Sequence, residues 1–319
     1  MNVARDQAMA KRDASASGSD TTPFRFYDNR QKYLAFVNTC NEKSAVARRA
    51  TQELSHIRPM PPALRIFDAG MGDATVLSRL MRSVHRTFPT VPLLVVAKEI
   101  SLEDVRLGLE KMPARFYEHP ATVLVITNLN YAEAPRLMPR DTQLAAALNW
   151  QEVRLTGNSS HEYGEQIEEL SSTIAYGWQT KPSTKSGNPV YTRPSVLVIY
   201  REDHKFLLDS VIPKPGRIFE SYDLIVASQP WRARMSAEFK AQKVLAPLTR
   251  SLAPGGRLLA IQSAGKDPAL EIIQKLWPGE NPFQVDRHQL LAALTTELGR
   301  DARDYTLTAV ASDKDMFRY

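Results

Sequence analysis

The stretch Leu64-Arg-Ile-Phe-Asp-Ala-Gly-Met-Gly-Asp73 decides the fold of this chain. Its first half is a short apolar strand, and two glycines spaced one residue apart then break it. From Ala74 to Met81 the apolar residues fall on one stripe, which is typical of an amphipathic helix. Strand, glycine bend and helix in this order let a backbone pass close beneath a nucleotide-like ligand. The acid at the strand's tip, Asp68, favours a ligand with a cationic or hydroxyl-rich edge over a bare pyrophosphate.

Alternating strands and helices extend outward from this stretch. Almost purely apolar runs predict strands at 64–68, 92–97, 122–127, 222–228 and 257–262. Between them, helices are predicted at 74–88, 102–112 and 237–252, and a later helix at 287–298 precedes a strand at 305–311. Strands that are apolar on both faces and separated by amphipathic helices are typical of a mostly parallel, doubly wound α/β sheet.

The alternation is interrupted at 132–195. This segment contains a candidate strand at 149–155, a helix at 162–174 and a Lys/Ser/Thr/Gly/Pro-rich loop at 180–194, and a short strand follows at 195–200. Because the stretch is long, we expect it to be an insertion between the third and fourth core strands, and loops on such scaffolds usually carry specificity.

The N-terminal region is predicted to have two parts. Residues 1–22 resemble a flexible tail, since little in them could be buried to offset the entropy of ordering. Residues 23–62 are rich in helically spaced aromatic and apolar residues and predict a helical cap. Residues 63–319 then form the main domain, with the insertion inside it.

Composition excludes several classes of protein. The 319 residues carry a formal charge of +6 with basic residues scattered along the chain, so nucleic acid is a possible but less favoured partner. Cys40 is the single cysteine, which excludes an intrachain disulfide and a cysteine metal cage. The six histidines show no ligand spacing, so no metal is expected. No apolar run approaches the roughly 20 residues of a membrane span, and no secretion signal is visible, which predicts a cytoplasmic protein.

Four motifs in order resemble those of class I S-adenosylmethionine-dependent methyltransferases. They are Asp68-Ala-Gly-Met-Gly-Asp73, Glu99 after the second strand, Tyr222-Asp-Leu-Ile-Val-Ala-Ser-Gln-Pro230 and Leu252-Ala-Pro-Gly-Gly-Arg-Leu-Leu259. Each motif alone is weak, but the four occur in the family's order and at the expected strand ends. The resemblance covers roughly residues 64–262 without the insertion. It implies a Rossmann-like sheet of the seven-stranded methyltransferase type.

The resemblance also implies S-adenosylmethionine as the cofactor. The backbone of Ala69, Gly70, Met71 and Gly72 would pass beneath its methionine part, where side chains must stay out of the way. Asp68 would orient this loop and sense the ammonium group, directly or through water.

Other positions acquire roles from the same resemblance. Glu99 would accept both ribose hydroxyls, because a charged acceptor forms stronger hydrogen bonds than a neutral one. Ile100 would lie against the adenine ring, and Ser228 and Gln229 would lie in the loop facing the transferred methyl group. Asn128, at the end of the third strand, is expected to line the cofactor or substrate pocket.

The chain departs from the family pattern in three places. Asp73 replaces the third glycine of the loop and is expected to cap the following helix instead. The wide spacing between Asp68 and Glu99 implies a long first helix. The family closes its sheet with a final antiparallel hairpin, whereas this sequence stops soon after the strand predicted at 305–311, so an incomplete hairpin is expected.

Three alternatives stay open. A dinucleotide oxidoreductase is disfavoured, because Thr75 occupies the place of its third small residue. Asn128-Leu-Asn-Tyr131 resembles the Asn-Leu-Pro-Tyr signature of RNA adenine methyltransferases, but Asn130 replaces proline and the segment follows the third strand instead of the fourth. A catalytically silent S-adenosylmethionine-binding protein would carry the same cofactor motifs.

The function expected from the sequence is methyl transfer by in-line displacement, with a small-molecule acceptor favoured. Such a reaction depends mainly on orientation, which contributes about 7–11 kcal/mol, and requires no fixed catalytic triad. No catalytic residue is therefore assigned from the sequence.

Overall fold

The computed structural model describes residues 41–184, 189–217, 220–231, 234–263, 271, 274–275, 278–279, 281 and 283–310. The predicted tail, the part of the predicted cap before residue 41, and Cys40 lie outside these residues. The described end of the cap is helical, with α3 at Glu42–Glu53 and the short helix η2 at Leu54–His56.

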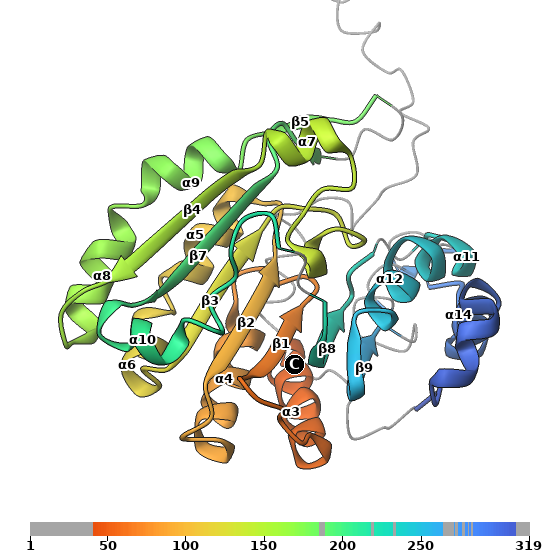
Figure 1. Cartoon of the computed structure of the whole chain (residues 1–319). Helices are drawn as coiled ribbons and strands as arrows, with labels where there is room; N and C mark the ends of the chain where they lie inside the picture. The colour runs from red at the N-terminus through yellow and green to blue at the C-terminus, as the bar shows by residue number, and fades with distance from the viewer. Residues whose placement is uncertain are drawn as a thin grey trace, which may run out of the picture.

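A seven-stranded, mostly parallel sheet forms the centre of the molecule (Figure 1), in the order β4-β7-β3-β2-β1-β8-β9. Five neighbouring strands run parallel: β3 (Thr122–Thr127), β2 (Leu93–Lys98), β1 (Leu64–Asp68), β8 (Tyr222–Ser228) and β9 (Leu252–Ile261). The predicted α/β class is confirmed, and the sheet is consistent with a Rossmann-like fold.

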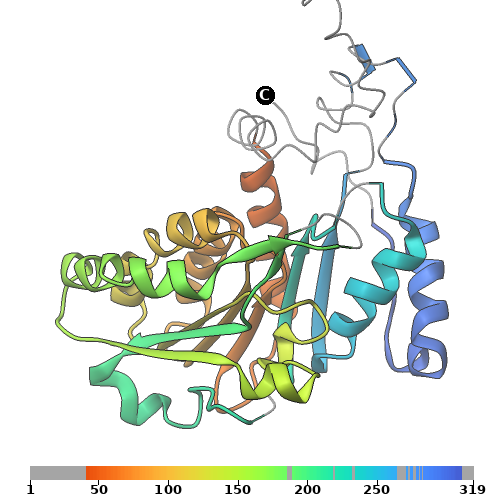
Figure 2. The same ribbon diagram turned by 90° about the horizontal axis from the view of Figure 1, so that it is seen from above.

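Helices cover both faces of this sheet (Figure 2). One face packs against α3, α4 (Thr75–Thr87), α5 (Leu102–Leu109), α6 (Pro113–Glu118), α8 (Ser160–Glu168) and α9 (Ser171–Gly177). The other face packs against η3 (Ala134–Arg136), α10 (Lys205–Leu208), and a continuous helical stretch of α11 (Ala237–Lys240), the π-helix η5 (Ala241–Leu245) and α12 (Ala246–Thr249). Helix α14 (Arg287–Leu298) packs on η5 and α12 through Leu290, Leu294 and Leu298. The predicted helices at 74–88 and 287–298 are thereby confirmed.

The remaining two strands run opposite to these five and come from the middle of the chain. Strand β7 (Ser195–Arg201) pairs antiparallel with β3, and β4 (Asn149–Leu155) pairs parallel with β7 as the outermost strand. All seven residues of β7 are buried, so this apolar run needs a strand on each side. The segment predicted to interrupt the core thus contributes strand β4 to the sheet and leads directly into β7.

The strand predicted at 305–311 is wrong over its described part. Residues 305–310 form no strand, and Ala311 lies outside the described residues. Tyr305 and Leu307 instead pack against the cluster of α14, while their neighbours are exposed. An alternating pattern therefore arises here from one-sided packing on a helix, without a ladder partner.

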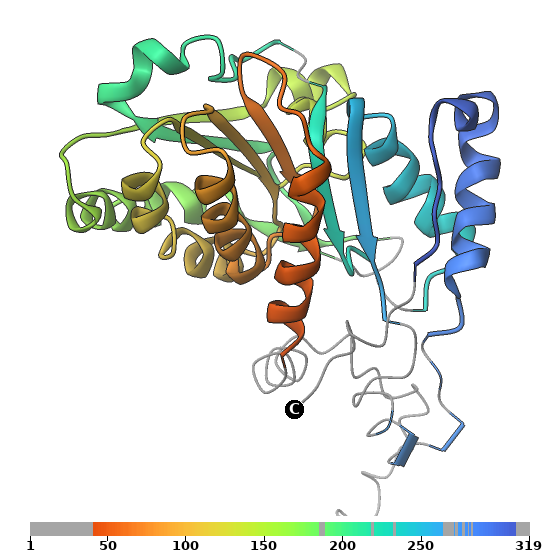
Figure 3. The same ribbon diagram turned by 90° about the horizontal axis from the view of Figure 1, so that it is seen from below.

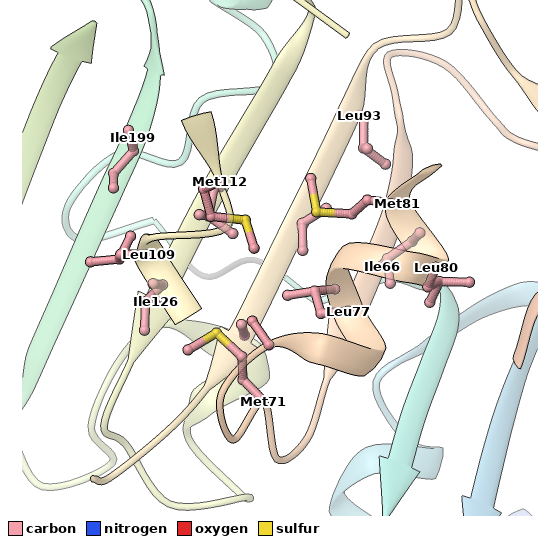
Figure 4. Packing of buried hydrophobic residues seen from close by; sticks show 14 of the residues in the cluster. Ile66, Met71, Leu77, Leu80, Met81, Leu93, Leu109, Met112, Ile126 and Ile199 are labelled. Carbon is pink, nitrogen blue, oxygen red and sulfur yellow. The ribbon is translucent and has the colours of Figure 1, made fainter. Parts of the chain in front are cut away.

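The glycine bend after β1 is anchored in the core by Met71. Figure 4 shows its side chain pointing into the cluster that also contains Leu77, Leu109 and Met112. A Cβ added to Gly108 of α5 would lie 2.9 Å from the Met71 Cε atom. The lack of a side chain at Gly108 therefore leaves room for the thioether that holds the bend down.

Glu53 joins α3 to the sheet. It is 5% exposed and accepts hydrogen bonds from Arg49 of the same helix and Arg257 of β9. Burial opposes ionisation, but the two guanidinium hydrogen bonds outweigh it and lower the pKa of Glu53. Its stabilising contribution is thus present above the unfolded-state pKa and is lost as the pH falls.

We expect Glu53→Gln to lower the free energy of unfolding by about 1–3 kcal/mol at neutral pH, since a charged hydrogen-bond acceptor is lost in a buried site. The difference from wild type should shrink as the pH falls below the ordinary value of 4.5. Urea unfolding at several pH values measures this. Glu165→Gln, in an exposed pair with His161, is the matched control and should change little. Equal effects of the two substitutions would contradict the assignment.

Candidate functional site

The bend between β1 and α4 is fixed by backbone hydrogen bonds on two sides. The Ala69 amide donates to the carbonyl of Val226 in β8 at 2.8 Å, and the Met71 amide donates to that of Lys98 in β2 at 3.0 Å. Gly72 has a φ of +52°, in the left-handed region that favours glycine. The bend is therefore held between its two neighbouring strands at their carboxyl ends.

Open space lies above both glycines of the bend. A Cβ added to Gly70 or Gly72 would meet no heavy atom within 4 Å. By contrast, a Cβ at Gly256 in β9 would lie 2.4 Å from the Tyr222 carbonyl oxygen. Packing thus requires glycine at position 256. At position 70 packing would allow a side chain, and glycine keeps that space open.

Glu99 is bound to the bend and to its own loop. Its Oε2 accepts from the Gly72 amide at 2.9 Å, and its Oε1 accepts from the amides of Ile100 and Ser101 at 2.8 and 2.9 Å. The Trp178 indole donates to the Glu99 carbonyl oxygen at 2.7 Å. The carboxylate predicted to lie across from the bend therefore contacts it directly.

A cavity of about 920 Å³ lies between these elements. The bend and β8 form its floor, the Glu99 loop and α5 one wall, the N-terminal end of α3 another, and residues 178–180 with Pro189 a third. Trp178 caps the end of α9, and Thr180 and Pro189 belong to a small hairpin of β5 (Thr180–Pro182) and β6 (Pro189–Tyr191).

Acidic side chains dominate the cavity lining. Seven carboxylates line it against two cationic side chains, Lys43 and Arg106. The carboxylates are Glu42, Asp68, Asp73, Glu99, Glu103, Asp104 and Glu110. This balance favours a ligand that carries positive charge.

Burial perturbs Asp68 strongly. It is 5% exposed, and within the described residues its one hydrogen bond comes from the Gly70 amide at 3.1 Å. Burial raises the pKa of Asp68 to about 7, the Gly70 hydrogen bond opposes the rise, and the nearby Glu99 charge adds to it. A ligand cation beside Asp68 would offset both the cost of burying its charge and the repulsion from Glu99.

Asp73 closes the bend on its outer side. Its carboxylate accepts from the amide and hydroxyl of Thr75 at 3.2 and 2.8 Å, which satisfies a donor in the first turn of α4. Lys43 of α3 donates to the same carboxylate at 2.9 Å, and Lys111 donates to the Asp73 carbonyl at 2.6 Å. Asp73 therefore ties the bend to α3 as well as to its own helix.

The structure brings most of the predicted cofactor residues together. Those that line the cavity are Asp68, Gly70, Met71, Gly72, Asp73, Glu99, Ile100 and Ser228. Ala69 is fully buried behind the bend. Gln229, with its side chain 2.7 Å from the Glu42 carboxylate, lies next to the lining residue Ser228.

Asn128 occupies a different position from the one predicted. It is 1% exposed and is absent from the cavity lining. Its amide nitrogen donates to the carbonyls of Gly177 and Arg193, and its amide oxygen accepts from the Ser195 amide. Asn128 therefore fixes the chain just before Trp178 and so positions a wall of the cavity.

Tyr131 is engaged in the same way, since its hydroxyl donates to the Pro230 carbonyl at 2.6 Å. Its ring lies 4.8 Å from the Lys98 ammonium. The polar side-chain groups of Asn128 and Tyr131 thus bind protein backbone, an arrangement that gives no support to recognition of a flipped base.

Helix α3 of the predicted cap, and residues 178–180 with Pro189 of the predicted insertion, supply walls of the cavity, but the individual residues that do so were not predicted. Lys43 and Trp178 lie 30 and 79 residues from their partners Asp73 and Glu99. No local motif marks such pairs. Trp178 is 4% exposed and packs in the core, and it lines the cavity as well.

Metal binding and membrane crossing are two further properties of the described residues. No group of three or more His, Cys, Asp or Glu side chains among them could hold a metal ion. None of the described helices has the length and apolar character needed to cross a bilayer.

Fold and site together define an α/β protein with a cavity at the carboxyl ends of its parallel strands. Comparison with models of known protein families, and with curated proteins, found no match.

The raised pKa of Asp68 makes stability depend on pH. A carboxyl whose folded pKa is raised stabilises the protein at low pH and loses this contribution as the pH rises through the folded value. We expect Asp68→Asn, which does not titrate, to gain stability relative to wild type between about pH 4 and about pH 8, by up to about 4 kcal/mol. Thermal or urea unfolding across this range measures the difference. A constant difference would show that Asp68 keeps an ordinary pKa.

Proposed function

We propose that the protein is an S-adenosylmethionine-dependent methyltransferase of the class I type. The observation that carries the proposal is the direct contact of the bare glycine bend with Glu99 at the edge of one cavity. In the resembling family these two elements bind the two ends of the cofactor. Here the Gly72 amide and the Glu99 carboxylate are 2.9 Å apart, so one ligand can contact both.

The residues present fit this cofactor. S-adenosylmethionine carries an ammonium, a sulfonium and a ribose diol, and the lining is mainly anionic. Its methionine part would lie over Gly70 and Gly72, where no side chain intrudes. Asp68 at the floor would become fully ionised beside the ammonium group.

Glu99 has limited remaining capacity to accept hydrogen bonds from the ribose hydroxyls. A carboxylate offers about four acceptor positions, and three are occupied by the amides of Gly72, Ile100 and Ser101. One position on Oε2 stays available, which suits one hydroxyl directly. The second hydroxyl would require a water or the release of one amide. These three amides also fix the carboxylate before the ligand arrives, which lowers the cost of binding.

The main task of the protein in this reaction would be to orient the cofactor and the acceptor. The bound cofactor would supply an electrophilic methyl group, and the acceptor would attack it in line. The bend, Asp68 and Glu99 would hold the cofactor, while Ser228 and the start of the following loop would border the acceptor. A general base is needed only for a protonated acceptor. The enclosing hairpin and α5 favour a small-molecule acceptor over a bulky one at the cavity itself.

The first test is Gly70→Val. Its side chain should project into the open cavity and exclude the cofactor while the protein still folds, because nothing lies within 4 Å of the new Cβ. We expect no measurable S-adenosylmethionine binding by calorimetry, with an unfolding midpoint close to that of wild type. Gly164→Val is the control, since its new Cβ would make ordinary contact with Pro113 at 3.8 Å, and it should bind normally. Normal binding by Gly70→Val would refute the site.

The second test is Glu99→Ala. Loss of the charged acceptor would remove the ribose contact and leave three amides without their partner, so binding should become undetectable by calorimetry. A charged hydrogen bond contributes about 1.5–3 kcal/mol, and several are lost at once. Glu110→Ala removes an exposed carboxylate from the rim of the same cavity and should weaken binding little. Similar affinities for the two variants would exclude the proposed role of Glu99.

Turnover separates an enzyme from a silent binding protein. The wild type should consume S-adenosylmethionine and release S-adenosylhomocysteine in the presence of a metabolite extract, and Gly70→Val should not. Tight binding with no turnover across fractionated extracts would favour the silent alternative.

A further inference from the structure

Helices α3 and α4 pack side by side (Figure 3), and both carry exposed arginines. Arg48 on α3 and Arg79, Arg82 and Arg86 on α4 are all exposed. Over Glu42–Glu53 and Thr75–Thr87, both described in full, the only acidic residues are Glu42 and Glu53. These two are 4% and 5% exposed, so neither neutralises the arginines at the surface.

A groove of about 460 Å³ runs between the two helices. Arg48 and Arg79 line it, together with the hydroxyls of Ser44, Thr51 and Ser83 and the amide of Gln52, and no acidic side chain is among its lining residues. Arg79 donates to Ser44, and Thr51 donates to Ser83 at 3.2 Å. Guanidinium and hydroxyl donors are thus held together along a concave surface.

The clustered arginines repel one another and so destabilise the helices when no anion is bound. Arg79, Arg82 and Arg86 follow one another at spacings of three and four residues, where like charges repel. No exposed carboxylate on either helix compensates them. The three arginines extend over about 10 Å of helix axis, which exceeds the size of one phosphate. The surface therefore matches an extended polyanion.

We infer that the α3–α4 surface binds the phosphodiester backbone of a nucleic acid. Arginine, serine and threonine side chains are common donors to backbone phosphates. An anionic membrane fits less well, because none of the exposed large hydrophobic residues among the described part of the chain lies on α3 or α4. The inference depends neither on the ligand of the large cavity nor on Asn128 and Tyr131.

The surface also adjoins that cavity. Lys43 and Val46 of α3, and Asp73 and Val76 at the start of α4, line the cavity, and the groove begins at Ser44 and Arg79. A nucleic-acid strand bound along the groove would therefore reach the mouth of the cavity. Binding by this surface would thus place a nucleic acid close to whatever the cavity holds.

The test measures binding of a labelled single-stranded RNA of about 20 nucleotides to the full chain by fluorescence anisotropy, from low to moderate salt. The affinity should fall linearly with salt on a double-logarithmic plot, since phosphate contacts release counterions. Arg48→Gln with Arg79→Gln should weaken binding by about tenfold or more at low salt and reduce the salt slope by about 1.4, because each single-strand contact contributes about 0.7.

A matched control removes the same charge elsewhere. Arg154 and Arg250 are exposed arginines paired with acidic neighbours, so Arg154→Gln with Arg250→Gln should leave affinity and slope nearly unchanged. If the groove variant is poorly folded by thermal unfolding, Arg82→Gln with Arg86→Gln replaces it, with the same expected loss.

Three results would overturn the inference. One is equal loss in the groove and control variants, which would indicate a general charge effect. Another is binding of phosphatidylserine vesicles as tight as that of RNA and equally sensitive to the groove substitutions. The third is the absence of binding to the phosphodiester backbone, seen either as no salt-dependent RNA binding or as complete displacement of the RNA by millimolar inorganic phosphate at constant ionic strength.

Discussion

Burial of the Met71 side chain is the constraint on which the candidate site depends. Two flanking glycines make the bend flexible in principle, and a flexible bend would have to be ordered whenever a ligand bound. Met71 removes that cost by lying in the core beside Leu77 and Leu109, in the space left by Gly108. The same residue thus holds the backbone close to the sheet and keeps side chains out of the cavity above it.

Adjacent residues at the end of β2 serve opposite faces of the sheet. Glu99 turns toward the bend, whereas Lys98 is 8% exposed and lies over the Tyr131 ring. Burial lowers the pKa of Lys98, and the Glu99 charge raises it. With Asp68 buried nearby, the end of the sheet contains acids and a cation in little solvent, where a bound charged ligand changes the local electrostatics strongly.

The parts of this structure that were predicted correctly from the sequence are those determined by residues close together in the chain. Apolar runs fixed β1, β2, β3 and β8, and the glycine spacing together with Glu99 located the cavity floor. Asn128 and Trp178 could not be placed, because their roles depend on partners 49–79 residues away in the chain. Tyr305 and Leu307 show a complementary failure, since alternation is produced equally by a strand and by a segment packed along a helix.

Strands β4 and β7 explain why the segment that contains them supplies both an edge of the sheet and a wall of the cavity. Without β7, strand β3 would expose an unpaired edge, and a buried edge must be satisfied or covered. Strand β7 pairs with that edge, and β4 becomes the new edge with several partly exposed positions. The chain between β4 and β7 must then return across the carboxyl ends of the strands, where Asn128 fastens it and Trp178 closes the cavity. Sheet completion and cavity enclosure are therefore linked, so changes in residues 156–184 would affect stability and the shape of the cavity together.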